Sequence, residues 1–264
     1  MLSLAGDVAY FFEPDHVLPA EYWYKYLHPS ESDLLLEGHI RDSFAGRIHD
    51  EYVIAEQGLP EMLRVPRALN VLVKWVRFGL SLDWIAARFP ELVVIQLVRH
   101  PVPLMLSWRQ RSWDPAHWLP SLLNQRDLME GPLACYEGVM RTASSYWEVA
   151  AAFWCAVVKM QLSADRPNWL LVEHEWLCAD PAHRLRWIVN HVGLEWNSKV
   201  EEFISPHRER GSGPGYGARR DPRGEINKWR DRIGREERRQ IMAVMSKFEL
   251  PFYPGLDPTR SWIS

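Results

Sequence analysis

An arginine and a serine eight residues apart are the first residues in this chain whose types suit a shared ligand. Arg99 follows the apolar run 92–98, and Ser107 lies in the segment that begins at Pro101. A guanidinium forms charge-assisted bonds to phosphate oxygens, and a serine hydroxyl can donate one more bond to the same anion. The pair therefore favours a phosphate-binding site. The alternative is a surface arginine and a helical serine that bind no ligand.

The local sequence predicts elements that would position both side chains. Residues 92–98 are aliphatic apart from Gln96, which is typical of a strand in the middle of a parallel sheet with helices on both faces. Pro101 and Pro103 are compatible with the start of a helix but not with its interior. Ligands bind at the carboxyl ends of strands in such sheets, and a helix that starts there offers free N–H groups to an anion. We therefore expect the anion site where this strand ends.

A second predicted strand brings two more cations to this region. Residues 71–76 form a short apolar run that carries Lys74 and is followed by Arg77. A helix is then predicted to start near Ser81 as its N-cap, and it leads into the strand that bears Arg99, as in the right-handed crossover of a parallel sheet. We therefore expect Lys74 and Arg77 near the same edge as Arg99, where three cations would favour a polyanion.

An acidic residue ends the first predicted strand. Glu13 follows the apolar run 8–12 and precedes Pro14. At the end of a strand, its side chain would point into a cleft at that edge of the sheet. The alternative is an exposed acid before a turn proline.

A further buried strand is predicted over 169–172, and His174 follows it closely. A helix then begins at Asp180–Pro181, a capping residue followed by proline at the first helical position, and ends at Gly193.

The segment 207–239 differs in composition from the rest of the chain. It contains eleven Lys and Arg against six Asp and Glu, with four glycines between 211 and 217. A basic, glycine-rich segment is typical of a surface loop, or of a lid that closes over phosphates. Residues 235–248 then show a periodic apolar face, which predicts a closing helix.

The segment around Arg99 resembles the 3′-phosphate-binding segment of the sulfotransferase family. These enzymes transfer a sulfuryl group from 3′-phosphoadenosine-5′-phosphosulfate (PAPS) to a hydroxyl or an amine. The resembling features are a strand, then Arg-x-Pro, then a helix with Ser107 eight residues after the arginine. The resemblance implies that Arg99 and Ser107 hold the 3′-phosphate.

Two later segments resemble the same family in the expected order. The span from His174 to the Asp-Pro-capped helix is similar to the family's Tyr-Glu-Asp-Leu stretch, with His174 where the family often has a tyrosine that touches adenine. Arg223-Gly224 followed by Trp229-Arg230 resembles an Arg-Lys-Gly segment and a later Trp-Lys pair.

The late segment implies that Arg223, Gly224, Trp229 and Arg230 complete the 3′-phosphate site. It departs from the family at Pro222, which replaces the first arginine of the triplet. Arg219 or Arg220 would then have to compensate.

The resemblance implies one α/β domain over 1–264, with a three-layer, P-loop-NTPase-like parallel sheet flanked by helices. The phosphate loop that should cradle the 5′-phosphosulfate has no counterpart in this sequence. We therefore expect a chain truncated at its N-terminus and lacking its first strand, either through a start codon assigned too far downstream or through a real loss.

The implied reaction is in-line sulfuryl transfer from PAPS to a carbohydrate or small-molecule acceptor, without a metal. In the branch that sulfates small phenols the base is a histidine, which Val76 replaces here. The resemblance is closer to the carbohydrate and tyrosyl branches, which implies Glu13 as the base. Lys74 or Arg77 would orient the acceptor or the phosphosulfate, and His16 is the second candidate base.

Two other classes of function remain open. One is an inactive sulfotransferase-like protein that binds a 3′-phosphorylated nucleotide without transfer. The other is a kinase-like nucleotide enzyme, against which stands the lack of a metal-binding aspartate after a phosphate loop.

Composition restricts the partners and the compartment. The chain has 264 residues, 47% of them hydrophobic and 25% charged, with a net charge of −3. These values favour a globular domain and argue against nucleic-acid binding. The longest uncharged apolar run, 149–158, is too short to span a bilayer, and residues 1–20 do not resemble a signal peptide. Three cysteines at irregular spacing predict free, buried thiols, hence a cytoplasmic protein with no membrane partner. The oligomeric state stays open.

Overall fold

The computed structural model describes residues 2–57, 59–164, 166–204 and 222–257. The chain divides into two compact units. Unit 1 comprises Met1–Leu92 and Leu185–Arg208, and unit 2 comprises Val93–Arg184 and Glu209–Ser264. A single domain over 1–264 therefore stays a prediction.

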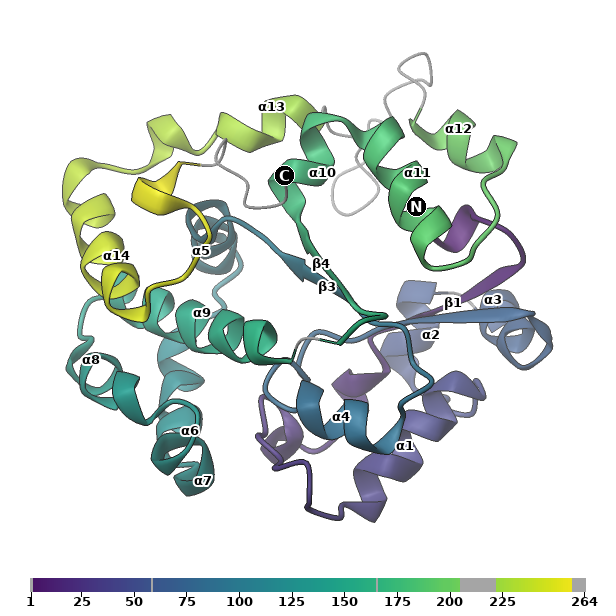
Figure 1. Ribbon diagram of the computed structural model, residues 1–264, viewed down its shortest axis with the longest axis horizontal. Coiled ribbons are helices and arrows are strands. Elements are labelled where there is room, and N and C mark those ends of the chain that lie inside the picture. The colour runs from purple at the N-terminus through teal and green to yellow at the C-terminus, as the bar shows by residue number, and fades with distance from the viewer. Residues whose placement is uncertain (1, 58, 165, 205–221, 258–264) are drawn as a thin grey trace. The chain divides into compact units, whose positions relative to one another are not determined.

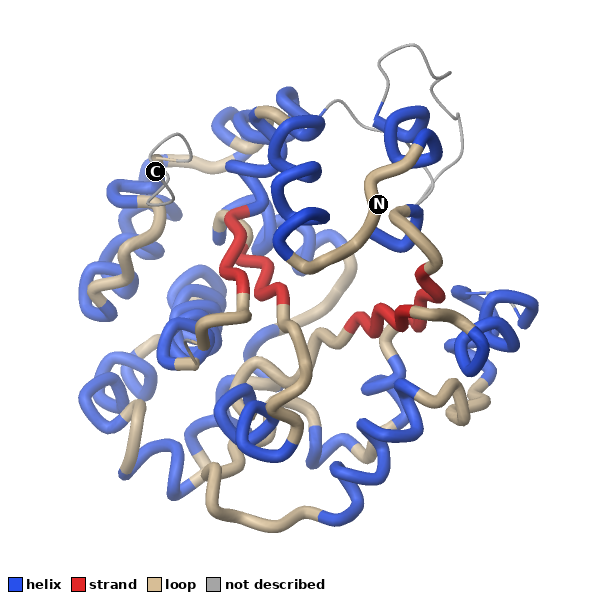
Figure 2. The backbone as a smooth tube through the Cα atoms, turned by 45° about the vertical axis from the view of Figure 1, so that its right-hand side comes forward, coloured by secondary structure: helices blue, strands red, loops and turns tan. Residues whose placement is uncertain are grey.

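Unit 1 is built on two parallel strands, β1 (Val8–Phe12) and β2 (Asn70–Lys74). Their register runs from Val8 opposite Asn70 to Phe12 opposite Lys74, so both strands end at the same level. Figure 2 shows the strands of the chain in red. Ala9 and Phe11 on β1 are fully buried. Together with Val53 and Val65 they form the core of this sheet.

Short helices precede and follow these strands in the sequence, and α2 and α3 pack against β1. Asp33 caps α1 by accepting a 3.0 Å bond from the Leu36 N–H. The helices of unit 1 are α1 (Leu34–Phe44), α2 (Glu51–Gln57), α3 (Leu59–Arg64), α4 (Leu82–Arg88) and α12 (Ser198–Ile204), with 3₁₀ helices over Leu2–Leu4, Pro14–Val17, Ala20–Tyr22 and Val65–Arg67.

Unit 2 contains the second parallel pair, β3 (Ile95–Val98) and β4 (Leu170–Glu173). Val98 lies opposite Glu173 at the carboxyl end of the pair. Val98 is 2% exposed but Leu97 is 53% exposed, so β3 is not buried on both faces within its own unit. The reason is that β3 pairs with β4 alone among the described residues, whereas the apolar run predicted a strand with neighbours on both edges.

A long apolar helix, α9 (Tyr146–Ser163), forms the centre of unit 2 and packs against α14 (Arg235–Phe248) (Figure 1). The shorter helices of this unit are α5 (Pro101–Gln110), α6 (Leu119–Leu123), α7 (Arg126–Glu130), α8 (Glu137–Thr142), α10 (His174–Ala179) and α13 (Pro222–Asn227), with 3₁₀ helices over Pro115–His117, Ala134–Tyr136, Arg230–Arg232 and Pro254–Leu256; α11 (Pro181–His191) begins here and continues into unit 1.

The chain is thus a mixed α/β protein, mostly helical, with two small parallel sheets. No ladder joins β2 to β3 in the described part of the chain. The three-layer sheet, and an edge shared by Lys74, Arg77 and Arg99, therefore stay predictions.

The cysteines differ in part from expectation. Cys155 and Cys178 are buried, as predicted, but Cys135 is exposed because it lies in a 3₁₀ helix that buries none of its residues. Within the described residues, no helix is long and apolar enough to cross a bilayer.

Candidate functional site

Glu13 and Lys74 form an ion pair at the carboxyl end of the β1–β2 pair. Lys74 Nζ donates a 2.5 Å bond to Glu13 Oε1, and Lys74 also lies over the Phe12 ring at 4.6 Å from its centre. Glu13 has a left-handed backbone with φ of 40°, because the strand turns there into the 3₁₀ helix that starts at Pro14. Its side chain is largely buried, whereas that of Lys74 is 40% exposed. The register of β1 and β2 therefore brings together the two residues predicted to be catalytic.

A second carboxylate, Asp15, is fully buried behind this pair. Its Oδ2 accepts bonds from the backbone N–H groups of Val76 (3.1 Å) and Arg77 (2.9 Å), and from Arg77 Nη1 (3.2 Å). Burial raises the pKa of Asp15, although the Arg77 guanidinium and these bonds oppose that effect. Arg77 Nη1 also lies 3.8 Å from Glu13 Oε2, so one guanidinium contacts both carboxylates.

Aromatic rings enclose the same residues. The His16 ring packs on Tyr52 at 4.0 Å and on Trp23 at 5.5 Å between ring centres. The Tyr52 hydroxyl lies 3.5 Å from Glu13 Oε2. Burial, followed by the charge of Glu13, raises the pKa of Tyr10 to about 12, so this phenol stays protonated. The arrangement places a carboxylate, two cations and an imidazole in a partly apolar setting, which suits proton transfer next to a developing negative charge.

Arg99 follows β3 in unit 2. Its Nε is buried and has no hydrogen-bond partner among the described residues. Its carbonyl accepts a 3.2 Å bond from Trp154 Nε1, which fixes the backbone where the strand ends. A buried donor without a partner is costly. Among the described residues of unit 2, Arg99 is therefore well suited to receive an anion.

The helix after Arg99 begins where the prolines predict. Pro101 is the first residue of α5, and His100 caps the helix by accepting a 3.2 Å bond at Nδ1 from the Val102 N–H. Ser107 is half-buried in the second turn of α5. Its backbone N–H is therefore beyond the first turn, and only its hydroxyl is offered to an anion.

His100 and Glu175 anchor a buried polar network around the carboxyl end of β3 and β4. The His100 N–H lies 3.2 Å from Glu175 Oε2, and the Tyr253 hydroxyl donates a 2.6 Å bond to the same oxygen. His100 Nε2 lies 3.3 Å from the Leu256 carbonyl, so the imidazole carries its proton on Nε2 and accepts at Nδ1. Burial lowers the pKa of His100 to about 4, which keeps it neutral.

His174 follows Glu173 at the carboxyl end of β4, as Arg99 follows Val98 at the carboxyl end of β3, and Val98 and Glu173 are opposite each other. Its Nδ1 lies 3.3 Å from Glu175 Oε1. Burial alone would lower the pKa of His174, but Cys178 and the Glu175 carboxylate raise it to about 9. The Cys178 sulfur lies 3.5 Å from Nε2 and 3.8 Å from Nδ1. Because the two distances are similar, the sulfur is not aligned with the lone pair or N–H of either nitrogen. The ion pair with Glu175 is therefore the directed contact.

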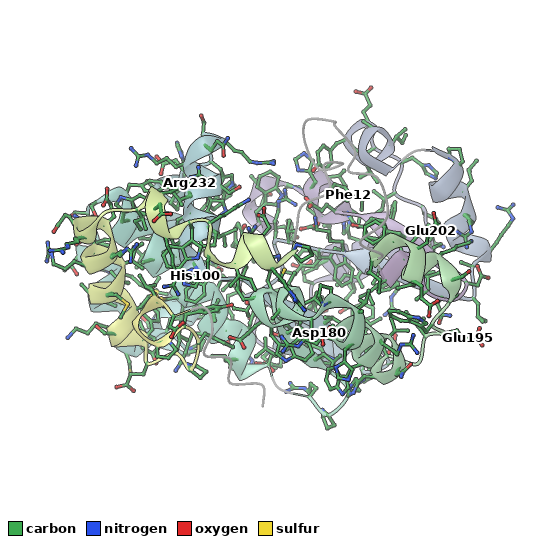
Figure 3. The ribbon with its side chains drawn as sticks, turned by 90° about the horizontal axis from the view of Figure 1, so that it is seen from above. Phe12, His100, Asp180, Glu195, Glu202 and Arg232 are labelled. Carbon is green, nitrogen blue, oxygen red and sulfur yellow. The ribbon has the colours of Figure 1, made fainter. Side chains whose placement is uncertain are left out.

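The late cofactor-binding candidates reach this end of unit 2 through α13. Arg223 Nε donates a 3.0 Å bond to the Ala179 carbonyl, and α13, which carries Gly224, packs on α10. Trp229 is 2% exposed and stacks on His100 at 4.4 Å between ring centres, so its ring belongs to the core. Figure 3 labels His100 among the side chains of unit 2. The Arg230 side chain is 48% exposed. The predicted substitutes Arg219 and Arg220 lie outside the described residues.

Each strand pair thus collects one predicted set of residues at its carboxyl end. The β1–β2 pair carries Glu13 and Lys74, and the β3–β4 pair carries Arg99 and His174. Sequence reasoning assigned no role to Asp15, His100, Glu175 or Tyr253, whose partners are distant in sequence. The available signal was that Asp15, His100 and Glu175 each lie within three residues of the end of a predicted strand.

Comparisons with known proteins give little further guidance. No family model matches the chain, and no curated protein matches it. Among solved structures, the chain is similar to the "Sulfotransferase Domain from the Curacin Biosynthetic Pathway", with 14% sequence identity and a TM-score of 0.41. The alignment covers 94% of this chain and 99% of that chain. A similarity at this level carries no assignment.

Proposed function

We propose that this protein is a sulfotransferase that transfers a sulfuryl group from PAPS to a hydroxyl or amine of a carbohydrate or other small molecule. The observation that carries the proposal is the Glu13–Lys74 pair, a largely buried carboxylate 2.5 Å from an ammonium at the carboxyl end of two parallel strands. The motifs around Arg99 and His174, which resemble the sulfotransferase family, support it.

In the proposed reaction, the acceptor oxygen forms a bond to sulfur while the bond from sulfur to the bridging phosphate oxygen breaks. The acceptor's proton goes to Glu13, and adenosine 3′,5′-bisphosphate leaves. Lys74 and Arg77 supply positive charge beside Glu13. Such fixed cations stabilise charge that develops in the transition state.

Four features of unit 2 suit the 3′-phosphate of the donor. Arg99 has a buried Nε–H without a partner in the described chain, and Ser107 offers a hydroxyl from α5. His174, whose pKa is raised to about 9, adds a second positive charge at the carboxyl end of the same strand pair. Arg223, at the start of α13, adds a third cation, and its Nε donates to the Ala179 carbonyl of α10. A phosphate is the ligand that these donors favour.

Replacing the proposed base tests the function. Glu13→Gln removes the proton acceptor but keeps the size of the side chain, so release of adenosine 3′,5′-bisphosphate in the presence of carbohydrate acceptors should slow by about 10²–10⁴. PAPS affinity, measured by calorimetry, should stay nearly constant. Glu21→Gln is the matched control, because Glu21 is an exposed acid of the same segment.

The outcomes separate the alternatives. A loss below about threefold in Glu13→Gln would show that another group acts as the base. PAPS binding by the unmodified chain without transfer to any acceptor would favour a protein that binds the nucleotide and does not transfer. Absence of PAPS binding would contradict the proposal.

A further inference from the structure

We infer that Asp15 and Arg77 are positioning residues that hold the His16 ring with Nδ1 as a hydrogen-bond acceptor and its proton on Nε2. The consequence is that Glu13, and not His16, accepts the proton of the acceptor. That consequence rests on the proposed function, whereas the protonation pattern of His16 does not.

The contact between Arg77 and His16 sets the pattern. Arg77 Nη2 lies 3.2 Å from His16 Nδ1. A guanidinium has only donors, so the imidazole nitrogen that faces it must accept. The ring proton is then on Nε2. A proton on Nδ1 would lose this bond and face a positive charge at 3.2 Å.

Asp15 keeps the guanidinium in this position. Its Oδ2 binds both the backbone N–H and the Nη1 of Arg77, so backbone and side chain are held by one oxygen. Asp15 is fully buried and the Arg77 side chain is only 14% exposed, which protects the ion pair from solvent screening. Since Asp15 and His16 are consecutive, the same short 3₁₀ helix fixes both partners of Arg77.

Aromatic packing restricts rotation of the imidazole. Tyr52 lies against one side of the His16 ring at 4.0 Å with 31° between the ring planes. The Trp23 ring lies 5.5 Å from the His16 ring between ring centres. The Arg77 guanidinium lies over the same Trp23 ring, 4.5 Å from its centre. The ring therefore cannot exchange its two nitrogens without disturbing several packed groups.

The two candidate bases consequently differ in what they can do. His16 accepts at Nδ1, which Arg77 occupies, and donates through Nε2. Glu13 is a carboxylate with acceptor oxygens only. Proton acceptance therefore falls to Glu13, and His16 can serve as a hydrogen-bond donor.

Long-range ¹H–¹⁵N correlation spectra of the full-length, ¹⁵N-labelled chain test the inference directly. His16, assigned through the signals that disappear in His16→Gln, should show protonated Nε2 and unprotonated Nδ1. Arg77→Met removes the donor and should yield a mixture of both tautomers. Arg77→Lys retains a donor and should preserve the original tautomer.

His100 is the internal control in every variant. Its Nδ1 accepts from Val102 and its Nε2 faces the Leu256 carbonyl, so its tautomer should not change while unit 2 is folded. If Arg77→Met fails to fold, Asp15→Asn keeps the side-chain shape and should also populate the second tautomer.

Two results would overturn the inference: a proton on Nδ1 of His16 in the unmodified protein, or an unchanged His16 tautomer when Arg77→Met is folded. Once transfer is measured, Glu13→Gln should lose at least tenfold more turnover than His16→Gln, and the opposite order would overturn the assignment of the base. Absence of transfer in the unmodified chain would contradict only the proposed function, because the spectra need no activity.

Discussion

Arg99 differs from the cations of unit 1 in what its side chain contacts. Lys74 and Arg77 are bonded to carboxylates, whereas the buried Nε of Arg99 has no partner among the described residues. A buried unsatisfied donor costs about 1–3 kcal/mol, and more when it belongs to a charged group. An anion at this position would remove that cost, which makes Arg99 the residue whose substitution is most informative about binding.

Arg99→Ala should therefore weaken binding of adenosine 3′,5′-bisphosphate more than Ser107→Ala does. A charge-assisted bond contributes about 1.5–3 kcal/mol and a neutral one roughly 1 kcal/mol. These energies correspond to losses of about 10- to 150-fold and about 5-fold in affinity. Calorimetry measures both, with Arg109→Ala as the control because Arg109 is an exposed arginine of the same helix. Unchanged affinity in a folded Arg99→Ala variant would remove Arg99 from the site.

Asp15→Ala should strongly destabilise unit 1. It leaves the Arg77 guanidinium and two backbone N–H groups without their acceptor, and breaking a buried pair costs about 3–5 kcal/mol. Urea unfolding measures the change in the free energy of unfolding. Asp7→Ala is the matched control, since Asp7 is 56% exposed and its ion pair with Arg64 is also exposed. Equal effects of the two substitutions would argue against a stabilising role for the buried pair.

At the scale of single residues, the sequence predicted which residues follow apolar runs but not which partners they contact. Glu13 and Lys74 were proposed separately, each from its own strand, and the register then placed them 2.5 Å apart. Asp15 was not predicted, because its partners are 61 and 62 residues away and an aspartate after a turn proline has an ordinary local reason to be there. Glu175 was missed because its partners His100 and Tyr253 are 75 and 78 residues away.

Elements with a clear period were predicted within a residue or two. The run 8–12 became β1, and the apolar face over 235–248 became α14 with the same bounds. The helix expected near Ser81 begins at Leu82, but the Ser81 hydroxyl donates to the Lys25 carbonyl and does not cap it. That cap was wrong because a tertiary contact competes for the same hydroxyl. β3 is shorter than the run 92–98, starting at Ile95.

The N-terminus of α9 allows a test of element stability. Ser145 Oγ accepts a 3.2 Å bond from the Glu148 N–H, and the Glu148 carboxylate accepts a 3.0 Å bond from the Ser145 N–H, which forms a capping box. Ser145→Ala should lower the free energy of unfolding by about 1 kcal/mol. Urea unfolding should show a smaller effect for Ser246→Ala, an exposed serine inside α14. Equal effects would mean that the capping box does not stabilise α9.

At the scale of the whole molecule, strand partners were harder to predict than strands. β2 and β3 are adjacent in sequence and separated by one helix, which predicted a paired crossover. In the described residues β2 pairs with β1, and β3 pairs with β4. The end of β3 at Val98 and the start of β4 at Leu170 are 72 residues apart in the sequence. Pairing between distant strands depends on packing and loop closure, which no local pattern records. The single continuous sheet therefore remains to be tested.

Two histidines of unit 2 should give its stability a maximum near pH 6.5. The pKa of His100 is lowered to about 4 by burial, so between pH 4 and about 6.5 the unfolded chain binds a proton that the folded one does not. Stability should then rise with pH, by about 1.4 kcal/mol per unit at most. Burial lowers the pKa of His174, but the combined effects of Cys178 and Glu175 outweigh burial and raise that pKa to about 9. Stability should therefore fall between pH 6.5 and 9 as the folded state loses its extra proton.

Urea unfolding across this pH range, in the unmodified chain and in His174→Gln, tests the alkaline arm of that curve. His174→Gln cannot bind the proton, so the fall between pH 6.5 and 9 should disappear while the acidic arm, which depends on His100, remains. His191→Gln is the control, because His191 is an exposed histidine at the end of α11. A fall that persists in His174→Gln would show that the His174 imidazole is not held in its charged form, and would weaken the case for a second cation at the proposed phosphate site.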